Sequence, residues 1–331
     1  MLDIGIHPWP GRQGASAGVN GDARPNQTRP SIGLALGGGA ARGWAHIGVI
    51  RRLAKAGIVP DVIAGTSIGA VVGGCHAAHG LDSLERFARG LSKRRVFGLL
   101  DFNFAGSGLI TGNRLAKLLA QGLRDTQLED LPTRFVCVAT ELGTGHEIWL
   151  SKGHLVESLR ASYALPGVFK PVKVHGRWLI DGALVNPVPI SVCRAFGARL
   201  VIAVNLNTDL FGKGTVVRAH DPVSNGCDAA EQEWPDEPET AGARTLLRRQ
   251  LVGSGDGPPG ISSVMVDAFN IVQDRIARSR LAGDPPDIMI SPQLGHVGLF
   301  EFHRAREAID IGAKAAERVL AEIESSMVAL A

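Results

Sequence analysis

The chain has few cysteines, little excess charge and no apolar run of membrane-spanning length. Its four cysteines lie far apart without C-x-x-C spacing, which excludes a disulfide framework and indicates reduced thiols in a cytoplasmic chain. With 35 Lys and Arg against 32 Asp and Glu, the net charge of +3 is too even for a protein that grips nucleic acid through its phosphates. Residues 1–30 contain no signal-peptide core, and we expect a disordered or loosely attached extension there.

Glycine is abundant instead, at 42 of 331 residues, which predicts many tight turns or close backbone approaches. No charged residue occurs between Asp61 and Asp82, and glycines at G-x-x-x-G spacing within this stretch are typical of a transmembrane dimer helix. Polar residues interrupt the stretch, however, and its glycines lower the apolar content below that of a membrane span. A buried strand that leads into a closely packed helix explains it better.

Short apolar runs alternate with segments of helical periodicity, and this alternation predicts an α/β fold with a mainly parallel sheet flanked by helices. The expected strands are residues 32–36, 62–64, 135–139, 172–174, 178–180, 200–204 and 288–290. The expected helices are residues 45–56, 68–78, 84–91, 264–276 and 302–323.

One catalytic domain is expected over residues 31–320, followed by a C-terminal tail at 321–331. Within it, Gly and Pro accumulate between residues 206 and 262, and six acidic residues from Asp228 to Glu239 meet no Lys or Arg. This composition predicts a mobile acidic insertion, either a lid or a solvated loop.

A G-x-S-x-G pentapeptide at residues 65–69 lies between an expected strand and an expected helix, as a nucleophile elbow requires. The sharp turn presents Ser67 at the end of the sheet, where the helix N-terminus favours negative charge near the serine oxygen. Gly65 and Gly69 flank the serine because a Cβ at either place would meet the neighbouring backbone. Five letters also match by chance, but the strand-turn-helix setting favours Ser67 as a nucleophile.

A glycine-rich segment at residues 37–43 lies between the first expected strand and its helix. Consecutive glycines let several N–H groups point into one small space, which suits an anion. A dinucleotide site needs glycine where Arg42 stands, and a P-loop needs Lys after Gly43, where Trp44 stands. An oxyanion hole is the better interpretation, and a turn present only for packing is the alternative. The candidate residues of this hole are Gly37, Gly38, Gly39, Ala40, Arg42 and Gly43.

An aspartate follows the expected strand at 178–180 and begins the triplet Asp181-Gly182-Ala183. At the sheet edge its carboxylate can face the serine, but Asp-Gly is also a common turn dipeptide. The local sequence leaves both interpretations open.

A histidine that acts with the serine and the aspartate would distinguish a catalytic triad from a site without histidine. A conventional triad would continue after the serine and the aspartate with His296 or His303. His46, His154 and His175 show no ligand spacing with a second His, Cys or acidic residue, so we expect no metal site.

Basic residues precede apolar and aromatic ones between residues 86 and 104. This order suits docking on an anionic lipid surface, which would make a cytoplasmic protein peripheral at the inner membrane. More often, such a stretch is an amphipathic helix with a solvated face, followed by core-packing residues.

Taken in order, these motifs resemble the patatin-like phospholipases, and most closely the bacterial RssA-type branch related to neuropathy target esterase. The resemblance covers about residues 31–317 apart from the insertion, which has no reliable counterpart. It rests on the glycine-rich box with Arg42, the elbow at Ser67, Ala161-Ser162, Pro166-Gly167, Asp181-Gly182-Ala183, residues 186–189 and residues 282–287. The glycine box has one more residue before its arginine than the plant patatins, which matches the neuropathy-esterase branch.

The resemblance implies a three-layer fold and a Ser–Asp dyad without histidine, metal or cofactor. Ser67 would attack the carbonyl of an acyl lipid while Asp181 accepts its proton. The N–H groups around residues 38–40 would hold the oxyanion, and water would release the fatty acid. A carboxylate with an ordinary pKa of about 3.9 is a poor base for a serine, so the site would depend on oxyanion stabilisation.

The sequence is compatible with three functions. The leading one is a serine hydrolase of phospholipid or lysophospholipid esters. The second is a binding or regulatory protein on the same scaffold with weak turnover, and the third is a small-ester or thioester hydrolase that uses histidine.

Overall fold

The computed structural model describes residues 29–99, 119, 122–123, 125–209 and 261–331. The expected extension at 1–30 and the expected insertion at 206–262 therefore lie almost wholly outside the described residues. Within the described ranges, every helix is too short or too polar to span a lipid bilayer.

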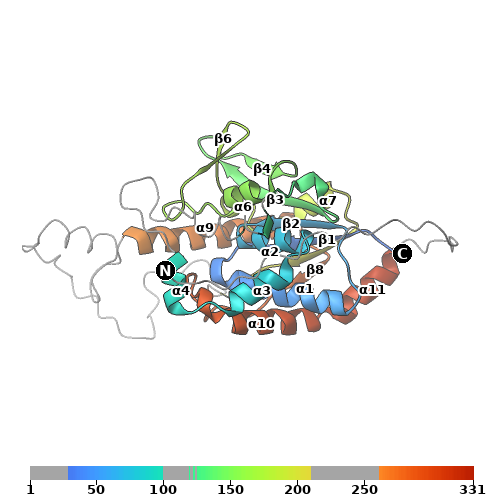
Figure 1. Ribbon diagram of the computed structural model, residues 1–331. Coiled ribbons are helices and arrows are strands. Elements are labelled where there is room, and N and C mark those ends of the chain that lie inside the picture. Colours follow the sequence, from blue (N-terminus) through green and yellow to red (C-terminus); the bar gives the residue numbers. More distant parts are fainter. Residues whose placement is uncertain (1–28, 100–118, 120–121, 124, 210–260) are drawn as a thin grey trace, which may run out of the picture.

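A single eight-stranded sheet forms the centre of the molecule (Figure 1), in the order β5-β6-β3-β2-β1-β7-β8, with β4 paired to β3. Strands β3, β2, β1, β7 and β8 are parallel to their neighbours in this order, whereas β4, β5 and β6 pair antiparallel. The strands are β1 (Ile32–Leu36), β2 (Val62–Thr66), β3 (Arg134–Glu141), β4 (Glu147–Leu150), β5 (Val172–Val174), β6 (Arg177–Asp181), β7 (Leu200–Val204) and β8 (Ile288–Ile290).

Helices cover both faces of the sheet. The α-helices are α1 (Ala45–Lys55), α2 (Ile68–Ala77), α3 (Leu81–Arg89), α4 (Lys93–Leu99), α6 (Leu155–Ser162), α7 (Ile190–Ala195), α9 (Ile261–Gly283), α10 (Ala305–Glu317) and α11 (Leu320–Leu330). Short 3₁₀ turns are η1 (Ala40–Trp44), η2 (Leu128–Asp130), η3 (Gly182–Leu184) and η4 (Phe302–Arg304).

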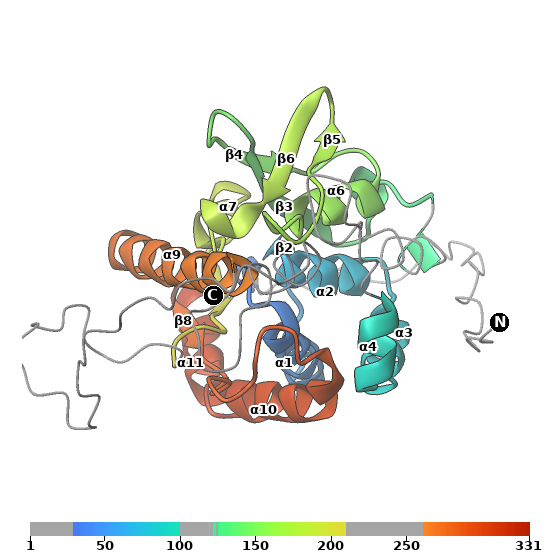
Figure 2. The same ribbon diagram turned by 90° about the vertical axis from the view of Figure 1, so that its left-hand side faces the viewer.

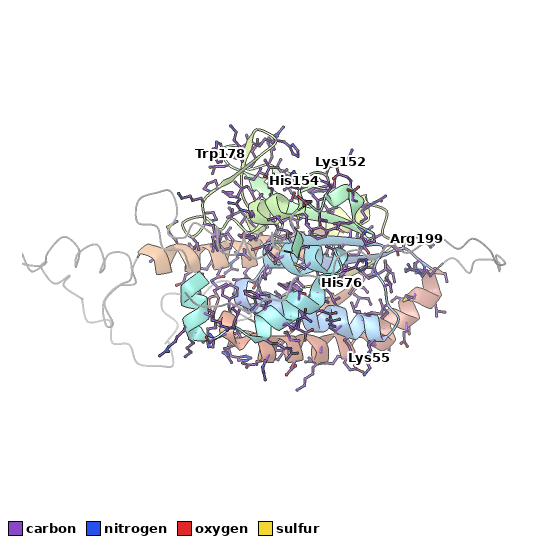
Figure 3. The ribbon with its side chains drawn as sticks, in the orientation of Figure 1. Lys55, His76, Lys152, His154, Trp178 and Arg199 are labelled. Carbon is purple, nitrogen blue, oxygen red and sulfur yellow. The ribbon has the colours of Figure 1, made fainter. Side chains whose placement is uncertain are left out.

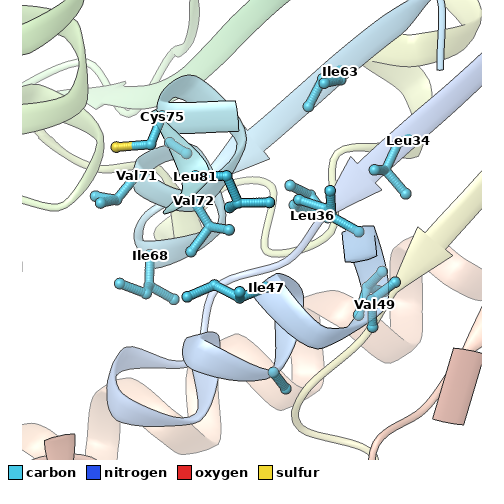
Figure 4. Packing of buried hydrophobic residues seen from close by; sticks show 14 of the residues in the cluster. Leu34, Leu36, Ile47, Val49, Ile63, Ile68, Val71, Val72, Cys75 and Leu81 are labelled. Atoms are coloured by element: carbon cyan, nitrogen blue, oxygen red, sulfur yellow. The ribbon is translucent and has the colours of Figure 1, made fainter. Parts of the chain in front are cut away.

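Alternation along the central strands divides the core into two layers, because successive side chains of a strand point to opposite faces. Leu34 and Leu36 of β1 join the larger cluster with α1, α2, α6 and α10, and Figure 4 shows the part of it between α1 and α2. Ala35 joins the second cluster, which packs under α7. A Cβ on Gly33 would lie only 2.7 Å from the Cβ of Cys193, so small residues on β1 let α7 approach closely.

Two glycines bring α1 and α10 into backbone contact beneath the sheet (Figure 1). A Cβ on Gly48 would lie 1.9 Å from the carbonyl oxygen of Ile309, and one on Gly312 would lie 2.0 Å from that of Ala45. Neither helix can carry a larger residue at these points without moving apart from the other.

The predicted fold class is confirmed, and the expected strands and helices are present where the chain is described. Two details differ. The helix expected over 302–323 is divided into η4, α10 and α11, and residues 321–331 form most of α11 instead of a tail, with Ile323 fully buried. Sequence periodicity did not predict β4, α6 or α7, each of which is short, with four to eight residues.

Candidate active site

Ser67 occupies a sharp turn between β2 and α2. Its φ of 56° and ψ of −123° place it in a region that residues other than glycine rarely adopt, which costs roughly 1–3 kcal/mol. A Cβ on Gly65 would lie 2.5 Å from the Cα of Ala70, and one on Gly69 would lie 2.2 Å from the carbonyl oxygen of Leu36. The two flanking glycines therefore permit a turn that backbone on both sides would otherwise block.

Hydrogen bonds from other elements hold this turn. The Ser67 amide donates to Oγ of Ser162 at 2.9 Å, and that buried hydroxyl donates in turn to the carbonyl of Val138 at 2.6 Å. The Thr66 hydroxyl donates to the carbonyl of Asn186 at 2.8 Å. Sequence reasoning did not predict that Ser162 positions the turn, and the only signal for it was the Ala161-Ser162 motif of the family resemblance.

Asp181 ends β6 and is buried at 2% exposure. Its Oδ2 accepts a hydrogen bond of 2.7 Å from Oγ of Ser67, while its Oδ1 accepts the amide of Ala183 at 2.9 Å. The pairing of β6 with β3 places the aspartate here, since Asp181 is opposite Ala139. A Cβ on Gly182 would lie 2.2 Å from the carbonyl oxygen of Val138, so the turn after the aspartate also packs against β3.

Burial raises the pKa of the Asp181 carboxyl from an ordinary 3.8 to about 7, although the hydrogen bonds from Ala183 and Ser67 act to lower it. A carboxylate of this basicity is a far better proton acceptor near neutral pH than a solvated aspartate. Burial therefore removes much of the difficulty that the sequence alone suggests for a base without histidine.

The glycine-rich loop uses some of its N–H groups to hold itself in place. Gly37 donates to the carbonyl of Val204 at 3.0 Å, and Gly38 donates to that of Pro187 at 2.9 Å. The N–H groups of Gly39 and Ala40 have no acceptor within the part of the chain that the structure describes. The candidate oxyanion donors in the loop are thereby narrowed from the whole box to these two residues.

Two buried basic residues stand in or beside this loop. His46 is fully buried, its Nε2 lies 2.8 Å from the carbonyl of Gly37, and burial lowers its pKa to about 4, so it is a neutral donor to the loop. Arg42 is also buried, which lowers its pKa to about 10, with Asp209 opposing that change. Arg42 makes no hydrogen bond to Ser67 or Asp181 among the described residues, and its Nε and Nη1 are buried without a described partner.

The other candidate histidines lie elsewhere. His296 bonds Glu307 at 2.8 Å, and His303 lies in η4, whereas the Asp181 carboxylate bonds only Ser67 and Ala183 within the described ranges. The described residues hold no group of three or more His, Cys, Asp or Glu side chains that could bind a metal ion. Figure 3 shows His76 and His154 well apart, in line with that finding.

A serine on a strained strand–helix turn, bonded to a buried carboxylate, is an arrangement suited to nucleophilic attack on esters. The family model of the patatin-like phospholipases matches residues 34–194, which include the glycine loop, the elbow and Asp181. NTE family proteins of Mycobacterium tuberculosis and Mycobacterium bovis are 33% identical over 89% of this chain and 92% of their own length. The chain therefore belongs to the patatin-like phospholipases, in the branch of the NTE family, and is an enzyme of the lipid ester hydrolase class.

More distant proteins share part of this likeness. Lysophospholipase NTE1 of Pyricularia oryzae is 27% identical over 86% of this chain, which spans 18% of that longer protein. The crystal structure of VipD from Legionella pneumophila aligns over 89% of this chain and 67% of its own, with 16% identity and a TM-score of 0.46.

Proposed function

We propose that this enzyme hydrolyses the carboxylic esters of phospholipids or lysophospholipids with a dyad of Ser67 and Asp181. The observation that carries the proposal is the 2.7 Å hydrogen bond from the Ser67 hydroxyl to the buried Asp181 carboxylate. The substrate class is supported by the fungal relatives named lysophospholipases.

In the first half-reaction, Oγ of Ser67 attacks the acyl carbonyl carbon and its proton passes to Oδ2 of Asp181. The carbonyl oxygen becomes an oxyanion, which the N–H groups of Gly39 and Ala40 stabilise. Collapse of this intermediate breaks the ester bond, and Asp181 returns the proton to the departing alcohol. The acyl chain then remains on Ser67.

In the second half-reaction, a water molecule attacks the acyl-enzyme. Asp181 accepts a proton from that water, and the same N–H groups stabilise the second oxyanion. Release of the fatty acid returns the proton to Ser67. An Asp181 pKa of about 7 serves both steps, since the group must accept a proton and give it back.

We also propose that a small apolar cluster, which begins one residue after Ala164, gives the acyl chain a surface on which to pack. Leu165 and Val168 form the cluster with Phe169 and Phe269. Leu165 follows Ala164 directly, and the carbonyl of Ala164 accepts the amide of Asp181 at 3.0 Å. This adjacency supports a position of the apolar cluster near the reacting carbonyl.

The decisive experiment labels purified wild type, Ser67→Ala and Asp181→Asn with a fluorophosphonate probe and follows release of p-nitrophenol from an acyl ester. We expect labelling and turnover in the wild type, neither in Ser67→Ala, and little turnover in Asp181→Asn. The exposed-site variant Gln293→Ala serves as the comparison for folding and handling.

The other two functions give different results. A folded wild type that neither labels nor turns over would identify a binding or regulatory protein. Loss of activity in His296→Ala or His303→Ala would identify a histidine-dependent esterase, whereas the dyad predicts that both variants stay active.

Contact with a lipid surface is proposed for the basic end of segment 86–104. Lys93, Arg94 and Arg95 are exposed at the start of α4, whereas Arg89 on α3 is paired with Glu85. The side chains of residues 97–104 lie outside the described ones. Co-sedimentation with phosphatidylserine vesicles should weaken when the three exposed residues become glutamate, and equal sedimentation of both proteins would disprove the contact.

A further inference from the structure

A buried side-chain amide on helix α9 lies close to the active site, although this helix is far from Ser67 in the sequence. Figure 2 shows α9 lying next to α7, and the helix packs against η3, the turn that follows Asp181. Gln273, in the middle of α9, is only 4% exposed. Its side chain belongs to none of the motifs that the family resemblance contains.

Gln273 lies against the glycine loop on the side of the nucleophile. A Cβ built on Gly38 would stand 3.4 Å from Oε1 of Gln273, 3.3 Å from the Cβ of Ala183 and 3.6 Å from the Cβ of Ser67. The amide, the serine and the turn after the aspartate thus surround one point beside the loop. Gly38 immediately precedes Gly39 and Ala40, whose N–H groups are the candidate oxyanion donors.

The side-chain amide of Gln273 is free to bind a ligand. It has no hydrogen-bond partner among the described residues, and its N and O atoms are not among the fully buried unpartnered ones. The neighbouring Asp274 forms an ion pair with Arg278, whose Nε lies 2.8 and 3.0 Å from the two carboxylate oxygens. Rotation about the terminal bond exchanges Oε1 and Nε2 with little change of shape, so a donor can take the place beside Gly38.

We propose that Gln273 is a further catalytic residue, whose Nε2 donates a hydrogen bond to the oxyanion formed when Ser67 attacks an acyl ester. The inference rests on the proposed function, because it requires an oxyanion at this serine. A side-chain amide then adds to the backbone donors of Gly39 and Ala40. Loss of a single donor of this kind typically lowers kcat by about 100- to 1000-fold.

The test compares Gln273→Met, which keeps the length of the side chain without a donor, with the wild type and with Gln293→Met at an exposed position. We expect kcat for a p-nitrophenyl acyl ester to fall about 100-fold in Gln273→Met, with KM nearly unchanged and the melting temperature retained. Affinity for a trifluoromethyl ketone, which forms a tetrahedral adduct with the serine, should fall by a similar factor. Gln293→Met should match the wild type in each measurement.

A second variant separates donation from packing. Gln273→Glu keeps the shape but carries a negative charge beside the oxyanion at neutral pH, so its loss of kcat relative to wild type should shrink as the pH falls and the carboxyl becomes a donor. A purely structural role predicts a loss independent of pH.

The outcomes separate the two proposals. A wild type without turnover removes the dyad and the role of Gln273 together. If the wild type is active and Ser67→Ala is inactive, but Gln273→Met has the same kcat as the wild type, only the role of Gln273 is overturned. If Gln273→Met is unstable, a Gln273→Glu loss that does not change with pH would overturn it in the same way.

Discussion

Replacing Asp181 by Asn should abolish most turnover and at the same time stabilise the fold at neutral pH. The Asn side chain has nearly the same shape, its Oδ1 can accept the Ala183 amide, and its Nδ2 can donate to the Ser67 hydroxyl. It cannot accept the serine proton, so activity falls. It also carries no charge into a site where the carboxyl is 2% exposed.

The size of the gain follows from the pKa of Asp181, which burial raises from 3.8 to about 7. One pKa unit corresponds to about 1.4 kcal/mol, so ionising this group in the folded protein costs about 4 kcal/mol. Because the pKa of Asp181 is higher in the folded than in the unfolded protein, the stability that this group contributes is greatest below pH 3.8 and is lost as the pH rises toward 7. The advantage of Asp181→Asn should therefore grow over that interval and stay constant above it.

Urea unfolding at pH 5 and pH 8 measures this difference. The free energy of unfolding of Asp181→Asn should exceed that of the wild type at both pH values, and the excess should be larger at pH 8 by roughly 3 kcal/mol. Asp125→Asn, at an exposed turn, controls for the general effect of removing an aspartate. A variant less stable than wild type at pH 8, or an excess equal at both pH values, would refute the argument that burial raises this pKa.

Four further outcomes follow from the same site. In wild type, kcat/KM should rise with pH through about 7 and then level off, because only ionised Asp181 accepts the proton; a flat profile between pH 5 and 9 would contradict this. Ser162→Ala removes the acceptor of the Ser67 amide and should cost about 1–3 kcal/mol in urea unfolding and lower kcat. Gly69→Ala should yield little folded protein by circular dichroism, because its Cβ would lie 2.2 Å from the carbonyl oxygen of Leu36. Val168→Trp should lower kcat/KM for long acyl esters more than for acetate, and equal losses would remove the apolar cluster from the acyl site.

Local sequence was sufficient for the elements that a short pattern defines. The apolar runs at 32–36 and 62–64 mark strands that are buried throughout, and the G-x-S-x-G pentapeptide coincides with the strained turn at Ser67. The fold class followed from their alternation with helices. Strand β4 was missed because Glu147–Leu150 has only four residues and only its last one is buried, so it lacks both the length and the burial pattern of a core strand.

Local sequence patterns could not predict contacts between segments that are far apart in the chain. The hydrogen bond between Ser67 and Asp181 joins residues 114 positions apart and depends on how β6 pairs with β3. The raised pKa of Asp181 depends on complete burial, which no dipeptide reveals. Gln273 has no sequence motif around it, and only the packing of α9 against η3 brings it beside Gly38.

The strand order has a consequence for the smallest part of the chain that can act. The family match ends at residue 194, yet β7 begins at Leu200 and lies directly beside β1 in the middle of the sheet. The carbonyl of Val204, at the end of β7, also accepts the amide of Gly37. A fragment that ends at residue 194 would lose an inner strand and the anchor of its glycine loop, so the second half of the chain is as much a part of the catalytic unit as the residues that the family model matches.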